Sequence, residues 1–120
     1  MKMKGNCLCK KIEINLNKAC NRVTACYCNM CRTWADGALF SLAAAYLEND
    51  LKIEGKDWIQ EYKSSEAAMR GFCKNCGTSL YYKLNSGEYF LNVGLFADSD
   101  SDFQLVEEYD ADQKPTYLKQ

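Results

Sequence analysis

Residues 73–77 read Cys73-Lys74-Asn75-Cys76-Gly77, and this short stretch decides how the rest of the chain folds. A Cys-x-x-Cys pair directs two sulfur atoms at one metal ion from a tight turn, and the glycine that follows permits a left-handed backbone conformation. Structural zinc takes four ligands in a tetrahedron, so the pair needs two more. The stretch therefore predicts a metal-stabilised turn whose missing ligands come from elsewhere in the chain.

Cys7-Leu8-Cys9, near the N-terminus, can supply those two ligands by lying beside this turn. A shared metal would then clip an N-terminal strand to a turn more than 60 residues later. Closing so long a loop suits a domain with a thin core, because the free energy of metal binding becomes free energy of folding.

A second cysteine cluster reads Cys26-Tyr27-Cys28-Asn29-Met30-Cys31. Three sulfur atoms within six residues can wrap one face of a metal ion and leave its fourth position open, which is typical of a reactive rather than a structural zinc site. Zinc at such a position can lower the pKa of an incoming thiol or polarise a carbonyl oxygen. Cys20 either closes this site as a fourth ligand or is a buried thiol outside it. Other pairings of the remaining seven thiols around two metal ions also stay open.

The composition favours metal over disulfides. The chain has eight cysteines and no histidine, so a zinc site must be built from thiolates, with oxygen ligands as the only supplement. The opening residues 1–6 are charged and lack an apolar stretch behind them, from which we expect a cytoplasmic protein without a disulfide framework. A Cys73–Cys76 pair acting in thioredoxin-like redox chemistry is less favoured, because no βαβ pattern surrounds it.

The length and charge of the chain bound its organisation and partners. At 120 residues it fits one domain, which we take as a single zinc-binding domain over residues 1–120. No stretch approaches the ~20 apolar residues of a membrane span. Fifteen basic and sixteen acidic residues without a basic run argue against a nucleic-acid partner.

The hydrophobic pattern predicts a mainly β protein with few short helical turns. Alternating or short apolar runs predict strands at 11–16, 23–26, 38–47, 58–62, 88–96 and 103–106, and residues 53–56 predict a strand end and a turn. Residues 69–73 lead into the Cys73–Gly77 stretch, and 80–82 follow it. The segment 38–47 is ambiguous, because its alanines and leucines also favour helix; its flanking residues bound it at strand length. One helical turn is expected after the second cysteine cluster, through Trp34.

The cysteine pattern together with its neighbours resembles the glutathione-dependent formaldehyde-activating enzyme family, which includes relatives of centromere protein V. The resemblance covers roughly residues 5–98. Its elements are Gly5-x-Cys7-x-Cys9, Cys26-x-Cys28-x-x-Cys31-Arg32, Gly37, Tyr62-x-Ser64-Ser65, Arg70-x-Phe72-Cys73-x-x-Cys76-Gly77 and Val93-Gly94.

The resemblance implies both a fold and an activity. The fold is one of coiled, mostly antiparallel β-sheets related to duplicated zinc ribbons and stapled by zinc–thiolate knuckles. Two zinc ions are implied, a structural one held by Cys7, Cys9, Cys73 and Cys76 and a catalytic one held by Cys26, Cys28 and Cys31. The implied enzyme is a carbon–sulfur lyase that joins glutathione, or a similar thiol, to formaldehyde or a related aldehyde, as S-(hydroxymethyl)glutathione synthase does.

Two other readings of the cysteines compete with an enzyme. The chain can be a non-catalytic zinc-stabilised binding module, or a redox sensor that loses zinc when the 26–31 cluster is oxidised. Among the other side chains, Arg32 and Arg70 can pair with glutathione carboxylates, although structural contacts are the stronger expectation. Trp34 and Phe72 are expected to pack in the core rather than line a pocket.

Overall fold

The computed structural model describes residues 3–118, with the side chains of 98–101 left out of the description. Within these residues it has ten strands, one α-helix and five 3₁₀ segments. The strands are β1 (Met3–Asn6), β2 (Glu13–Leu16), β3 (Arg22–Cys26), β4 (Leu39–Leu42), β5 (Leu51–Glu54), β6 (Ile59–Lys63), β7 (Ala68–Cys73), β8 (Ser79–Leu84), β9 (Tyr89–Leu91) and β10 (Gln104–Tyr109). The helix is α1 (Asn29–Ala35), and the 3₁₀ segments are Glu48–Asp50, Lys56–Trp58, Val93–Asp102, Ala111–Gln113 and Thr116–Leu118.

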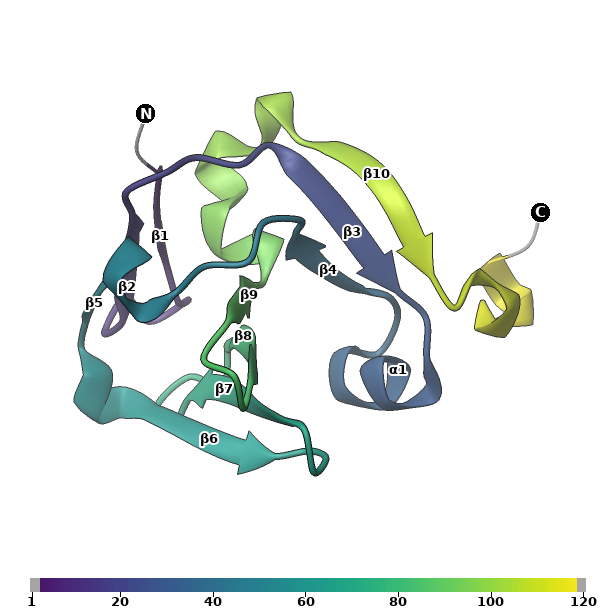
Figure 1. Ribbon diagram of the computed structural model, residues 1–120, viewed down its shortest axis with the longest axis horizontal. Coiled ribbons are helices and arrows are strands. Elements are labelled where there is room, and N and C mark those ends of the chain that lie inside the picture. Colours follow the sequence, from purple (N-terminus) through teal and green to yellow (C-terminus); the bar gives the residue numbers. More distant parts are fainter. Residues whose placement is uncertain (1–2, 119–120) are drawn as a thin grey trace.

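The strands form three small sheets, which Figure 1 shows arranged around the centre of the molecule. The first sheet has the order β1-β2-β5 and is antiparallel. In β2, Ile14 and Leu16 are buried while Glu13 and Asn15 are half-buried, so the alternation of the sequence becomes the two faces of the strand. The mainly β fold with mostly antiparallel sheets is therefore confirmed.

The second sheet is an antiparallel meander, β6-β7-β8-β9. Its central turn joins β7 to β8 and contains the Cys73–Gly77 stretch. Gly77 has a φ of 81°, the left-handed conformation that the sequence predicted for it. The backbone N–H of Gly77 donates to the Cys73 carbonyl at 2.7 Å, and that of Cys73 donates to the Thr78 carbonyl at 2.9 Å. These bonds fix the direction in which both cysteines project.

The third sheet has the order β10-β3-β4 and carries the second cysteine cluster at its end. β3 and β4 are antiparallel and are connected through α1, as Figure 1 shows. β10 pairs with β3 in parallel and brings a C-terminal strand to the N-terminal half of the chain. All six residues of β10 are exposed, so neither face of this edge strand is covered.

The core lies mainly between the first two sheets, and Leu42 of β4 in the third sheet joins it. Its fully buried side chains include Ile12, Ile14, Leu42, Leu80 and Leu91. None of the helices in the described part of the chain is long and apolar enough to cross a membrane.

Two sequence-based boundaries are wrong. The strand expected over 88–96 ends at Leu91, and a 3₁₀ segment begins at Val93. Leu95 and Phe96 are buried all the same, because this segment packs against β1 at Gly5. The strand expected over 38–47 covers only Leu39–Leu42, and Tyr46 makes a single bridge to Tyr89.

Candidate metal centres

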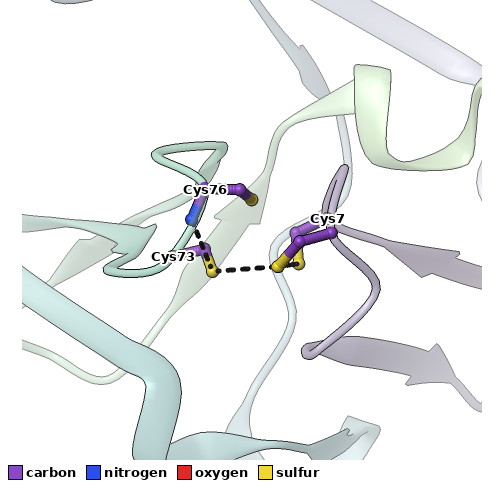
Figure 2. Close-up of side chains that lie close together, drawn as sticks. Cys7, Cys73 and Cys76 are labelled. Carbon is purple, nitrogen blue, oxygen red and sulfur yellow. Dashed lines mark hydrogen bonds between the residues drawn. The ribbon is translucent and has the colours of Figure 1, made fainter.

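Four cysteines from two distant turns meet in one group. Cys7 and Cys9 follow β1, whereas Cys73 and Cys76 come from the turn between β7 and β8. All four Sγ atoms lie within 4.8 Å of one another, with Cys7–Cys9 at 3.6 Å and Cys9–Cys73 at 3.8 Å. Figure 2 shows Cys7 opposite the turn that carries Cys73 and Cys76. Tetrahedral ligation with metal–sulfur bonds of about 2.3 Å places sulfur atoms about 3.8 Å apart, so this four-cysteine group can hold a metal ion.

Hydrogen bonds orient the sulfur atoms of the four-cysteine group. The backbone N–H of Ile12 donates to Cys7 Sγ at 3.4 Å, and that of Cys76 donates to Cys73 Sγ at 3.5 Å. Burial raises the pKa of the Cys7 thiol to about 11. Burial acts in the same direction on Cys76, but the hydroxyl and backbone N–H of Thr78 outweigh it and lower the pKa of that thiol to about 5. These hydrogen bonds thus favour the thiolate form of Cys76.

Three more cysteines meet where β3 passes into α1. Cys26 ends β3, Cys28 is the N-cap of α1, and Cys31 lies in the first turn of that helix. Their Sγ atoms all lie within 4.8 Å of one another. Cys28 Sγ accepts a hydrogen bond from the Cys31 backbone N–H at 3.3 Å. The start of the helix therefore holds the Cys28 sulfur close to Cys31.

The three sulfur atoms of this three-cysteine group differ in their surroundings. Burial raises the pKa of the Cys26 thiol to about 12. Burial also opposes ionisation of Cys28, but the backbone N–H groups at the start of α1, with the neighbouring thiols, lower its pKa below the usual range. The pKa of Cys31 is raised by burial, which the neighbouring Arg70 partly offsets.

Arg70 on β7 is a buried cation beside the three-cysteine group. The residue is only 2% exposed, and its Nη2 donates to Cys31 Sγ at 3.6 Å. Its Nε and Nη1 have no hydrogen-bond partner, and no carboxylate of the described side chains pairs with it. Burying an unpaired cation costs roughly several kcal/mol. A negative charge close to Arg70 would offset this cost. Three thiolates around a divalent ion carry one net negative charge, and the residues therefore fit a bound metal.

Aromatic side chains enclose this guanidinium group. The rings of Tyr82 and Trp34 lie 5.0 and 5.8 Å from the Arg70 Cζ atom. Trp34 stacks on Tyr62 and meets Phe72 edge-on at 5.9 Å, and its Nε1 donates to Ser79 Oγ at 3.0 Å. Trp34 and Phe72 therefore pack against each other, but both are half-buried and neither belongs to the hydrophobic core, so the expectation of core packing is wrong.

Cys20 belongs to neither cysteine group among the described residues. It is 8% exposed, and its thiol donates to the Arg22 carbonyl at 3.5 Å. Of the two alternatives that the sequence left for Cys20, the structure supports a buried thiol outside the metal centres. Arg32 also makes a structural contact, because its Nε donates to the Tyr27 carbonyl at 3.1 Å.

Sequence reasoning missed one polar residue at the three-cysteine group. Asp110 follows β10, and its Oδ2 lies 3.9 Å from Cys26 Sγ. The two residues are 84 positions apart, and no motif links them. Only the parallel pairing of β10 with β3 brings them together.

Comparisons with known proteins agree with this architecture. The model of the family described as glutathione-dependent formaldehyde-activating enzyme matches residues 2–111. A Schizosaccharomyces pombe protein named as an uncharacterized lyase is 34% identical over 94 residues, which cover 77% of this chain and 66% of that protein. The chain thus spans about two thirds of the length of this curated relative. A crystal structure of a Rhodobacter sphaeroides protein has the same fold, with a TM-score of 0.64 and 23% identity over 87% of this chain and 100% of that one.

Proposed function

This chain belongs to the glutathione-dependent formaldehyde-activating enzyme family, and from that premise we propose that it is a zinc-dependent carbon–sulfur lyase. It acts as a single zinc-binding domain with two zinc ions in separate roles. Cys7, Cys9, Cys73 and Cys76 hold the structural ion, while Cys26, Cys28 and Cys31 hold the catalytic one. The substrates are a small thiol such as glutathione and formaldehyde or a related aldehyde.

The reaction needs no oxidant or reductant. The sulfur of the thiol forms a bond to the aldehyde carbon, the carbon–oxygen π bond breaks, and the thiol proton ends on the oxygen to give a hydroxymethyl thioether. The lyase direction is the reverse. When bound, zinc supplies a Lewis acid that favours the thiolate form of the incoming sulfur.

The observation that carries the proposal is the three-cysteine group with its buried Arg70. Three protein sulfurs leave one position of a tetrahedral ion for a substrate, whereas the four-cysteine group has a complete set of ligands. Arg70 holds Cys31 through a charge-assisted hydrogen bond and fixes the direction of its sulfur. The N–H of Cys31 holds Cys28 in the same way.

The test is the rate at which formaldehyde and glutathione exchange with their adduct at equilibrium, measured by NMR exchange spectroscopy with zinc-loaded protein. We expect wild type to accelerate exchange, Cys28→Ser to lose the acceleration and Cys20→Ser, outside both groups, to keep it. Exchange no faster with wild type than with Cys28→Ser would overturn the lyase and leave a non-catalytic zinc-stabilised module.

A further inference from the structure

The segment after β10 lies against the three-cysteine group. β10 pairs in parallel with β3, and the last pair in this register is Tyr109 with Cys26. Both strands therefore end at the same edge of the sheet, and Figure 1 shows the C-terminal segment beside the connection from β3 to α1. Asp110 is the first residue beyond that edge.

Contacts on both sides of Asp110 hold it there. Before it, the Tyr109 carbonyl accepts the Tyr27 backbone N–H at 3.0 Å, and the Tyr27 hydroxyl donates to Glu108 Oε2 at 2.8 Å. After it, Gln113 Oε1 accepts the Asn29 backbone N–H at 3.2 Å. Tyr27 and Asn29, the two neighbours of Cys28, are thus hydrogen-bonded to residues on either side of Asp110.

The backbone of Asp110 is turned sharply at this point. Its φ of 54° and ψ of 42° lie in the left-handed region, where aspartate is among the few residues other than glycine that occur. The side chain is exposed.

The Asp110 carboxylate lies beside one sulfur atom of the three-cysteine group. Asp110 Oδ2 is 3.9 Å from Cys26 Sγ. In tetrahedral zinc ligation, a sulfur atom and an oxygen atom bound to the same ion are about 3.5 Å apart. The oxygen is not yet within 4.8 Å of all three sulfurs, so a rotation of the exposed side chain has to complete the set.

We infer that Asp110 is the fourth, displaceable protein ligand of the metal held by Cys26, Cys28 and Cys31. The inference rests on the proposed function in taking this group as a metal site with an exchangeable position. In a chain without histidine, a carboxylate is the natural supplement to thiolates. Oxygen is a harder ligand than sulfur, so Asp110 yields to an incoming thiol where a fourth cysteine would not.

The test uses the full chain loaded with ¹¹³Cd²⁺, whose NMR shift reports the number of sulfur and oxygen ligands. Wild type should give one signal for four sulfurs and one for three sulfurs with oxygen. Asp110→Gly keeps the left-handed turn but removes the carboxylate. The control is Asp112→Asn, which removes the same charge from an exposed residue in the next 3₁₀ segment. We expect Asp110→Gly to shift only the three-sulfur signal and to weaken cadmium retention there at least tenfold, while Asp112→Asn changes neither.

The unshifted four-sulfur signal shows in each variant that the fold is intact. Addition of glutathione should move the three-sulfur signal of wild type to the four-sulfur range, and Asp110→Gly should need less glutathione for the same change. Equal shifts and equal retention for Asp110→Gly and Asp112→Asn would overturn the inference. The proposed function would still stand after that result, provided that wild type accelerates glutathione exchange. If wild type does not accelerate exchange but Asp110→Gly shifts the three-sulfur signal, the lyase activity is contradicted and the ligand role of Asp110 is supported.

Discussion

At the scale of single residues, Arg70 has the most to explain, because a guanidinium group that is 2% exposed contacts a cysteine and no carboxylate of the described side chains. We predict that Arg70→Met weakens zinc retention at the three-cysteine group by about 10- to 100-fold, the usual effect of losing a partner of a metal ligand. Arg70→Lys keeps the charge and should lose less. Competition with a chelator measures both.

The control for Arg70 is Arg22→Met, which removes an exposed arginine from the start of β3. Thermal stability gives the second readout, because it separates a loss of zinc from a general loss of folding. A variant that melts at the same temperature or higher but loses zinc identifies Arg70 as a positioning residue. Unchanged zinc retention in Arg70→Met would contradict this role.

The grouping of Cys26, Cys28 and Cys31 could be predicted at this scale. The sequence singles out Arg70 but not its contact with Cys31, and it gives no sign of Asp110. Spacing alone groups Cys26 with Cys28 and Cys31, since neighbours within one turn must lie close together. Arg70 lies in β7, and its approach to Cys31 depends on how the second sheet packs against α1. The contact of Asp110 with Cys26 depends on a parallel strand pairing, which leaves no periodic signal in an edge strand that is exposed throughout.

At the scale of elements, two glycine turns share a backbone conformation but differ in the room that each leaves for a side chain. Gly55 and Gly77 have φ values of 85° and 81°. A Cβ atom at Gly55 would lie 1.9 Å from the Lys11 carbonyl oxygen, whereas at Gly77 it would meet nothing within 4 Å. We predict that Gly77→Ala costs about 1–2 kcal/mol, the ordinary cost of the left-handed conformation, and that Gly55→Ala costs clearly more.

Chemical denaturation of the zinc-loaded variants measures these differences. Gly94→Ala is the matched control, because its φ is not positive and its added Cβ meets nothing within 4 Å. Its free energy of unfolding should stay close to that of wild type. A Gly55→Ala variant as stable as Gly77→Ala would contradict the close approach of Gly55 to the Lys11 carbonyl.

Strand positions could be predicted where the sequence pattern alternates, although only β2 also alternates in burial, and not where apolar residues serve another element. The alternation of residues 11–16 became β2, and that of 58–62 became β6, within two residues at either end. The run 88–96 predicted one strand because Leu95 and Phe96 are apolar. Both residues lie in a 3₁₀ segment that packs against Gly5. Their apolar character therefore indicated burial and not a strand.

At the scale of the whole molecule, the four-cysteine group connects the first sheet to the second across 64 positions of sequence. The binding free energy of structural zinc is about 10–16 kcal/mol in small zinc domains, as large as the total stability of about 5–15 kcal/mol of an ordinary domain. The fold as a whole should therefore depend on this one ion. The three-cysteine group lies within a single strand–helix connection and closes no comparable loop.

On the proposed assignment of two zinc ions, we predict that a strong chelator removes them in separate phases. The ion of the three-cysteine group, which has an exchangeable position, should leave first without a change in far-ultraviolet circular dichroism. The second ion should leave together with the β-sheet signal, because Cys7 and Cys9 then lose their link to the β7–β8 turn. Cys28→Ser should lack the first phase and stay folded, while Cys73→Ser should not fold with wild-type stability. A chain that keeps its circular dichroism after both ions are gone would contradict the structural role of the four-cysteine group.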